Sequence, residues 1–280
     1  GGHGMMPNAE DRDANRAGLP EGLHWHGHGQ ATLTGSLLDY RERLDAAFAG
    51  HAGTLGAITL DPSPCLPPGV ADCCGYLTSF PHHASLASPY QRGEANDEKA
   101  EISVLTPAAC YHVYPLLAGR YLFDATVFTL RATCFRHEQE FMPLERQWAF
   151  TMRELVCAGT RTEVESFIDR LRRTVECWSR ALGLRGVFRQ ATDPFFDPGN
   201  SPGWLAQRLH PLKIELQVDG LAIASFNLHQ THFGEIFDIR RDGTTAWTGC
   251  VAFGLERWLG VLTRRHGRNP ARWPAPEVTA

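Results

Sequence analysis

The stretch that most constrains the fold is residues 123–182, where the spacing of hydrophobic residues changes from that of strands to that of a helix. FDATVFTLRATCFRHE (123–138) and RQWAFTMRELVCAG (146–159) are rich in β-branched and aromatic residues, as strands are. The short connection between them predicts an antiparallel hairpin. TEVESFIDRLRRTVECWSRAL (162–182) then repeats apolar residues at helical spacing, and Thr160 or Thr162 can cap its start.

The rest of the chain adds further strands and helices around this unit. Helical spacing or a terminal glycine predicts helices over 34–50, 103–119 and 254–266. Short apolar runs predict strands over 211–218, 221–228 and 246–252, and the Pro-, Cys- and Gly-rich stretch 60–95 is expected to be irregular. Strands in series with helices between and after them predict an α+β fold with an antiparallel sheet flanked by helices.

The ends of the chain read differently from its middle. Residues 1–30 are polar and rich in Gly and His, which predicts a flexible segment that begins with a tag scar, Gly1 to Gly4. Residues 31–270 are expected to form one catalytic domain and 271–280 a tail. His24, His26 and His28 alternate and could bind a metal, but a mobile surface stretch is the favoured interpretation.

Composition excludes several classes of protein. Of 280 residues 43% are hydrophobic and 21% charged, which is enough for an ordinary core. The net charge of -4 weighs against a broad surface for a polyanion such as tRNA. The eight cysteines include no CxxC pair, and with no signal peptide they are expected to be free in the cytoplasm. No apolar run is long enough to span a membrane.

Two segments carry chemistry together that neither carries alone. In CFRHE (134–138), Arg136 and Glu138 are two apart on a strand and therefore share a face. In GCVAFGLERW (249–258), Arg257 falls in the first turn of a helix, where the electropositive helix start can receive phosphate. Two arginines, an acid and an aromatic residue on one sheet face would suit a nucleoside triphosphate.

These segments resemble known motifs. Phe135 to Glu138, with Arg146 and Phe150, is similar to motif 2 of the class II aminoacyl-tRNA synthetases, and Gly254 to Arg257 is similar to motif 3. The span 75–262 resembles the amino acid:[carrier protein] ligases, truncated relatives of the zinc-dependent seryl-tRNA synthetases of methanogens. The similar stretches, in the family's order, are GYLTSFP (75–81), LTPAACYHVYP (105–115), CFRHE, FTMRELVCAG (150–159), ATDPFF (191–196), LKIEL (212–216), IASFNLHQTHFG (223–234) and TGCVAFGLERW (248–258).

The resemblance implies a site for ATP. Arg136 would hold and polarise the α-phosphate, and Arg257 would bind the γ-phosphate and stack over the adenine. Phe150 would form the opposite wall of the adenine slot. The remaining expected contacts are Glu138 to the adenine amino group, Arg146 to the outer phosphates or to the motif 2 loop, and Glu215 and Asn227 to the accompanying Mg²⁺.

The resemblance also implies one zinc ion per chain, held by Cys, Glu and Cys with an open fourth position for the substrate's α-amine. The ligands expected here are Cys134, Glu176 and Cys250, with Glu163, Glu165 and Asp169 as competitors of Glu176. The alternative is that both cysteines are small buried strand residues.

A few residues stay open at this point. Cys110 could lie near an amino-acid pocket or be a packed thiol, and His229 and His232 could line the pocket or hydrogen-bond within the core. One departure from the family's pattern is Asp197-Pro198, which stands where Gly-Arg is expected and puts a contact from that loop in doubt.

The implied reaction is ATP-dependent activation of a small amino acid, glycine or alanine, followed by transfer to the phosphopantetheine thiol of a carrier protein. The acidic chain favours a carrier protein over tRNA, and Arg170, Arg172, Arg173 and Arg180 are one candidate docking face, although a solvated helix face is favoured. The alternatives are a tRNA-aminoacylating enzyme, a non-catalytic paralogue and a structural zinc protein. Family analogy implies a homodimer.

Overall fold

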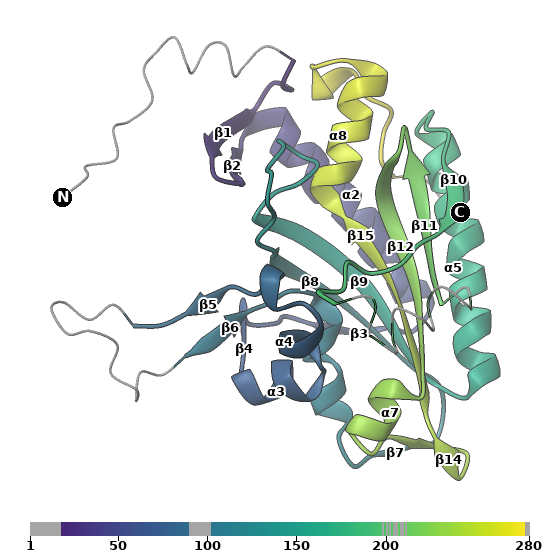
Figure 1. Cartoon of the computed structure of the whole chain (residues 1–280). Helices are drawn as coiled ribbons and strands as arrows, with labels where there is room; N and C mark the ends of the chain where they lie inside the picture. Colours follow the sequence, from purple (N-terminus) through teal and green to yellow (C-terminus); the bar gives the residue numbers. More distant parts are fainter. Residues whose placement is uncertain are drawn as a thin grey trace, which may run out of the picture.

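The structure is a computed structural model that describes residues 18–89, 102–197, 199, 201, 203, 207, 210 and 212–277. Its centre is a seven-stranded sheet with the order β10-β11-β12-β15-β9-β8-β3 (Figure 1). The strands are β3 (Ile58–Leu60), β8 (Thr126–Phe135), β9 (Ala149–Gly159), β10 (Val187–Gln190), β11 (Lys213–Val218), β12 (Leu221–Gln230) and β15 (Trp247–Gly254). All neighbours pair antiparallel except β3 and β8, so the expected antiparallel sheet is confirmed with one parallel edge.

Three helices cover one face of this sheet: α2 (Gly35–Thr54), α5 (Arg161–Ala181) and α8 (Leu255–His266), as Figure 1 shows. They match the helices expected over 34–50, 162–182 and 254–266. Strand side chains alternate between faces, so Val251 and Phe253 of β15 point into this core, whereas Cys250 and Ala252 point to the other side. We call the first side the helical face and the second the pocket face.

The pocket face is covered by short elements rather than long helices. They are β4 (Cys65–Leu66), α3 (Pro68–Cys73), α4 (Tyr76–Ser79), η1 (Pro81–His83), β5 (Leu86–Ala87), β6 (Ser103–Leu105), η2 (Ala109–His112), η3 (Tyr114–Leu117), β7 (Tyr121–Leu122), α7 (His232–Ile236), β13 (Arg240–Arg241) and β14 (Thr244–Thr245). Instead of the single helix expected over 103–119, a strand and two 3-10 turns follow one another, because Pro107 and Pro115 interrupt the backbone hydrogen bonds of a helix.

The start of α5 is fixed by a capping box. The Thr160 hydroxyl accepts from the Glu163 backbone N–H at 3.3 Å, and the Glu163 carboxylate accepts from the Thr160 N–H at 2.7 Å. Glu163 also pairs with Arg241 at 2.7 Å, which ties the helix to β13. Thr160, and not Thr162, is therefore the cap.

The expectation of a flexible segment up to residue 30 is wrong for its described part, since β1 (Leu23–Gly27) and β2 (Gln30–Leu33) form a hairpin. The hairpin tip packs on the 136–148 loop, where the Gly29 carbonyl accepts from Trp148 N–H at 2.9 Å. At the other end, η5 (Pro270–Arg272) and Trp273 pack beside Tyr40, so the tail is ordered as far as this. Residues 1–17 and 278–280 lie outside the described residues, as does the whole loop expected at 91–101.

No helix among the described residues is both long and apolar enough to span a membrane.

Candidate active site

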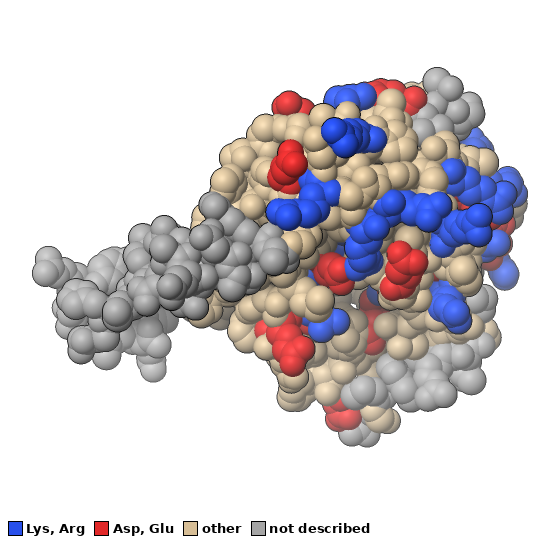
Figure 2. Space-filling model, turned by 90° about the horizontal axis from the view of Figure 1, so that it is seen from above, with Lys and Arg blue, Asp and Glu red and all other residues tan. Residues whose placement is uncertain are grey.

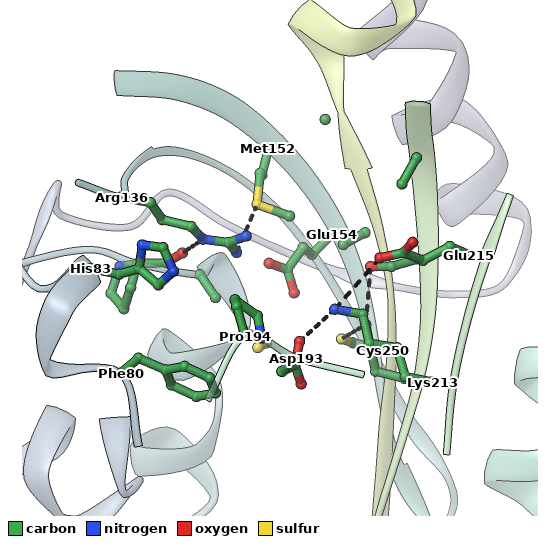
Figure 3. A pocket seen from close by; sticks show the side chains of 18 of the residues that line it. Phe80, His83, Arg136, Met152, Glu154, Asp193, Pro194, Lys213, Glu215 and Cys250 are labelled. Atoms are coloured by element: carbon green, nitrogen blue, oxygen red, sulfur yellow. Dashed lines mark hydrogen bonds and ion pairs between the residues drawn. The ribbon is translucent and has the colours of Figure 1, made fainter. Parts of the chain in front are cut away.

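A cavity of about 700 Å³ opens on the pocket face and is lined in part by β9, β11, β12 and β15. Figure 3 shows part of its lining. All residues expected to bind ATP line it: Arg136, Glu138, Arg146, Phe150, Glu215, Asn227 and Arg257. Arg136, Glu138 and Arg146 lie in the loop between β8, which ends at Phe135, and β9, so Arg136 and Glu138 are not on a strand as expected. The others come from the start of β9, from β11 and β12, and from the first turn of α8. The fold therefore gathers both motif segments, about 120 residues apart in the chain, at one site.

Arg136 is held in place by backbone and ring contacts. Its Nε donates to the Pro107 carbonyl at 3.0 Å, and its guanidinium lies 5.4 Å from the centroid of the Phe150 ring. One Nη contacts Met152 Sδ at 3.8 Å, and no acidic partner is recorded among the described residues. This leaves the planar charge directed at the cavity (Figure 3), where it can meet an anion.

Arg257 sits in the first turn of α8, as expected from the glycine before it. Its side chain donates to the carbonyls of Glu145 at 2.9 Å and Ala222 at 3.1 Å. Burial and the neighbouring Arg136 guanidinium lower the pKa of Arg257. Two arginines that repel each other across a cavity form a site that an anion would stabilise.

Glu256, beside Arg257, was not singled out from the sequence. It is buried, and its carboxylate accepts from the Thr151 N–H at 2.8 Å, so it fixes the start of α8 against β9. Asp193 and Lys213 also line the cavity and form an ion pair, with Glu215 3.7 Å from the same ammonium. Lys213 is the sole described lysine, because Lys99 lies outside the described residues.

A second group lies deeper in the same cavity. Cys110 of η2, Glu154 of β9 and Cys250 of β15 each offer one ligand atom, and these atoms all lie within 4.8 Å of one another. All three residues are buried. Two soft thiols and a carboxylate form a donor set suited to Zn²⁺, with room for a fourth ligand.

The carboxylate of Glu154 has a hydrogen-bond partner for only one of its two oxygens. One oxygen accepts from the Ala109 N–H at 2.9 Å, whereas Oε2 is buried without a hydrogen-bond partner. Burial raises the pKa of Glu154, and the hydrogen bond to Cys250, together with burial, raises that of Cys110. A buried oxygen without a partner is rare in folded proteins, and a bound cation would satisfy it. The residues present therefore fit a metal ion.

Cys134 does not belong to this group. It lies opposite Phe150 in the β8–β9 pair, whereas Cys250 lies opposite Val156 in the β15–β9 pair. The two thiols are thus separated by six positions along β9, about 20 Å in the strand direction. Cys134 is a fully buried core residue, and its expected role as a ligand is wrong.

Glu176 is also misplaced as a ligand. It lies on α5, on the helical face, and forms an ion pair with Arg180 at 2.6 Å. Its competitors Glu163, Glu165 and Asp169 lie on the same helix, so the sheet separates all of them from Cys250. The acidic member of the Cys110, Glu154 and Cys250 group is Glu154, which the sequence analysis did not name. One signal was available, because Glu154 is the single acid in the mostly buried strand Ala149–Gly159.

The open residues are now placed. Cys110 is a member of the group, and His229 and His232 line the cavity, with His229 Nε2 3.6 Å from Cys250 Sγ. His24 and His26 instead donate to or accept from Thr34 and Thr32 across the β1–β2 hairpin. In the Asp197-Pro198 departure, Pro198 lies outside the described residues.

The surface is not uniformly charged. On the face seen in Figure 2, Lys and Arg side chains gather over the right-hand half, with acidic side chains among them. The arginines of α5 lie on the helical face, away from the cavity: Arg180 is paired with Glu176, and Arg172 lies over the Phe188 ring at 5.2 Å. A carrier protein bound to these arginines of α5 would therefore lie on the opposite side of the sheet from the cavity.

Comparisons with known proteins identify relatives among the carrier-protein ligases and among the type-2 serine–tRNA ligases. Amino acid–[acyl-carrier-protein] ligase 1 of Bradyrhizobium diazoefficiens is 34% identical over 259 residues, which is 84% of this chain and 79% of that protein. A type-2 serine–tRNA ligase of Methanopyrus kandleri is 26% identical over 201 residues, 62% of this chain and 36% of the relative. A scan against protein-family models gives no match.

The solved structures agree on the fold. The crystal structure of M. kandleri seryl-tRNA synthetase with A. aeolicus tRNASec superposes with a TM-score of 0.78 at 22% identity. The match covers 98% of this chain and 60% of the synthetase. The expected catalytic core, that of the class II aminoacyl-tRNA synthetases, is confirmed at the level of the fold.

Proposed function

The chain belongs to the amino acid–[acyl-carrier-protein] ligase family, and on this premise we propose that it activates a small amino acid with ATP and transfers it to a carrier protein. The observation that carries the proposal is the buried Glu154 carboxylate, whose Oε2 has no hydrogen-bond partner. One of its oxygens lies within 4.8 Å of the Cys110 and Cys250 sulfurs, in the same cavity as the two motif arginines. One end of the cavity would take ATP and the other the amine of the amino acid.

At the ATP end, Arg136 would contact the α-phosphate and stabilise the charge that builds there during attack. Arg257 would bind the γ-phosphate and cover the adenine, with Phe150 as the opposite wall of its slot and Glu138 accepting from the adenine amino group. Arg146, which is exposed at the mouth, would reach the outer phosphates. Glu215 would face the Mg²⁺ that accompanies ATP, and Asn227 less directly, because its amide already donates to Cys250.

At the other end, Cys110, Glu154 and Cys250 would hold Zn²⁺, which supplies a Lewis-acidic position for an uncharged amine. An amino acid anchored by its amine would place its carboxylate toward Arg136, so the cavity orients the two reactants. The residues around the thiols are large: Tyr111, Phe233 and His229 line this end. We therefore propose glycine or alanine as the substrate.

The chemistry then runs in two steps. A carboxylate oxygen of the amino acid attacks the α-phosphorus of ATP, and pyrophosphate leaves, which gives the aminoacyl adenylate. The phosphopantetheine sulfur attacks the carbonyl carbon of that adenylate, AMP leaves with the electron pair of the broken C–O bond, and an aminoacyl thioester remains. The thiol proton passes to the departing phosphate or to solvent.

The acceptor is proposed to be a carrier protein rather than tRNA. The net charge of -4 disfavours a long polyanion, while the locally basic half of the face in Figure 2 suits a small acidic protein. We further propose a homodimer, by analogy with class II cores, and a cytoplasmic enzyme. All eight cysteines lie in described residues and are free, as a reducing compartment would keep them.

The first test is ATP–pyrophosphate exchange with each of the twenty amino acids, on protein whose zinc content has been measured. Exchange with glycine or alanine alone is the expected result. The same preparation is then offered a carrier protein with its phosphopantetheine arm, the same carrier without the arm, and tRNA. Loading of tRNA but not the armed carrier would transfer the proposal to a synthetase. Absence of exchange from folded, zinc-loaded protein would point to a paralogue that has lost the reaction.

A further inference from the structure

His229 reaches the cavity because β12 is bulged at this point. In the β12–β15 pair, Leu228 lies opposite Gly249 and Gln230 opposite Thr248, which leaves His229 as the extra residue. Gln230 has a φ of 54°, a left-handed conformation uncommon for a residue with a side chain. Bulges of this kind redirect a side chain next to a site, and here the redirected side chain is an imidazole.

The two nitrogens of this imidazole face different partners. Nδ1 lies 3.3 Å from the Tyr114 hydroxyl and 3.2 Å from the Thr248 hydroxyl, both of which can donate a proton to it. Nε2 lies 3.6 Å from Cys250 Sγ. If a hydroxyl donates to Nδ1, the ring carries its proton on Nε2, and that N–H points at the sulfur.

Cys250 therefore has two N–H groups directed at its sulfur. The second comes from Asn227, whose Nδ2 lies 3.4 Å from Sγ. Asn227 and His229 are two apart on β12, so one strand supplies both donors. A neutral thiol accepts weakly, whereas a metal-bound thiolate is a strong acceptor, so this arrangement suits the sulfur in its metal-bound form.

We propose that His229 is a positioning residue, which donates from Nε2 to the Cys250 thiolate and keeps the metal it holds receptive to the substrate's amine. The inference rests on the proposed function, because it needs a metal at the Cys110, Glu154 and Cys250 group. His229 is not a ligand itself, since its ring nitrogens fall outside the set of atoms within 4.8 Å of one another. Donation to the sulfur draws charge away from it, and such outer partners orient and tune metal ligands.

The chain offers a matched pair of variants to test this. The amide nitrogen of Gln can occupy the position of Nε2, so His229→Gln keeps the donor to Cys250. The amide of Asn reaches only as far as Nδ1, so His229→Asn keeps a polar side chain and loses the donor. Each is prepared free of metal and loaded with Co²⁺ or Zn²⁺.

Two readouts, neither of them activity, decide the outcome. For His229→Asn we expect zinc affinity, measured against a chromophoric chelator, to fall about 10- to 100-fold. Its thiolate-to-Co²⁺ charge-transfer band should move to longer wavelength, because the sulfur lone pairs lose their stabilisation. His229→Gln should stay close to the unmodified protein in both. The free energy of unfolding of the metal-free forms provides the control for packing.

Several results would overturn the proposal. His229→Asn with unchanged affinity and an unchanged band would show that the contact does not act on the sulfur. Equal losses of zinc affinity in both variants would mean that His229 acts through packing. Visible Co²⁺ bands that show the loss of a nitrogen ligand in the variants would mean that His229 binds the metal directly. If the unmodified protein gives no thiolate-to-Co²⁺ band at all, the metal assignment in the proposed function fails, and His229 is not the cause.

Discussion

Arg153 and Glu154 are adjacent on β9 and both are buried, yet the sheet sends them to opposite faces with opposite outcomes. On the helical face, Arg153 donates twice to Asp45 of α2, at 2.7 and 2.8 Å, and the ion pair is complete. On the pocket face, one oxygen of Glu154 lacks a hydrogen bond of good geometry and has only the thiols of Cys110 and Cys250 near it. A buried charge that is fully paired serves the fold, whereas one left open indicates a ligand.

The difference extends along the neighbouring strand. On β15, Val251 and Phe253 pack among the helices, and Cys250 and Ala252 line the cavity. Each strand in the middle of the sheet thus contributes to stability with every second residue and to the site with the others. Substitutions on one face should accordingly change unfolding, and those on the other should change metal binding and activity.

The largest effect is expected from Glu154→Gln. Gln keeps the size and can still accept from the Ala109 N–H, but it removes the negative charge between the two thiols. We expect stoichiometric zinc to be lost, and amino-acid-dependent pyrophosphate exchange to be lost with it. The free energy of unfolding of the metal-free variant should equal or exceed that of the metal-free unmodified protein, because burial already disfavours the charged form of Glu154. Metal analysis and denaturant unfolding measure both.

Glu176→Gln is the matched control, since it is the same exchange on the helical face. It should leave zinc content unchanged and remove only an exposed ion pair with Arg180, a loss of about 0.3–0.5 kcal/mol. If Glu176→Gln lost zinc and Glu154→Gln kept it, the assignment of the two faces would be reversed.

Asp45→Asn should produce the opposite pattern to Glu154→Gln. It leaves the buried Arg153 without its anionic partner, and breaking a buried pair on one side typically costs 3–5 kcal/mol of stability. Urea unfolding is the measurement, and the folded fraction should still bind one zinc ion. A variant of normal stability, or one that lost zinc while folded, would show that the two faces are not independent.

The two faces of the sheet also show what the sequence could and could not predict. The strands β8, β9, β11, β12 and β15 and the helices α2, α5 and α8 follow from local spacing, which one segment carries by itself, and the sequence narrows the cap of α5 to Thr160 or Thr162. The residues expected to bind ATP were identified by motifs within short segments, and they line one cavity. The metal group joins three segments, η2, β9 and β15, and depends on strand register, which spacing does not reveal. Cys134 lies on the pocket face but too far along the strand to reach Cys250, and Glu176 lies on the helical face.

The β1–β2 hairpin was missed for a related reason. Its glycines and histidines give no alternating apolar pattern, and its stability comes from pairing and from the contact of Gly29 with Trp148, far along the chain. At Gly29 a Cβ would lie 2.4 Å from the Trp148 nitrogen, so only glycine allows this approach. Glu154 left a local signal, a single acid in a buried strand, and that signal was passed over.

Arg136→Ala tests the pocket face at its ATP end. The side chain has no recorded acidic partner among the described residues, so its loss should hardly change the free energy of unfolding. Loss of one preorganised charge at the reacting phosphate should reduce the pyrophosphate exchange rate by about 10²–10³-fold. Arg172→Ala, on α5, is the control and should exchange normally. A full rate in Arg136→Ala would remove this residue from the reaction.

A further small effect is the pH dependence expected at Glu163, in the first turn of α5. The hydrogen bond from Arg241, followed by those at the start of α5, lowers the pKa of Glu163 below its ordinary value of 4.5. A carboxyl whose pKa is lowered by folding stabilises the protein above the unfolded value and loses that contribution as pH falls through the folded value. Gln can still complete the capping box, so Glu163→Gln removes mainly the ion pair with Arg241. The free energy of unfolding of the unmodified protein should therefore exceed that of Glu163→Gln by about 0.5–1 kcal/mol at pH 7, and the difference should vanish well below pH 4. Unfolding measured from pH 7 to pH 3 decides this, and zinc content at pH 7 should be equal in both proteins. A difference that persisted at pH 3 would mean that Glu163 acts through packing rather than charge.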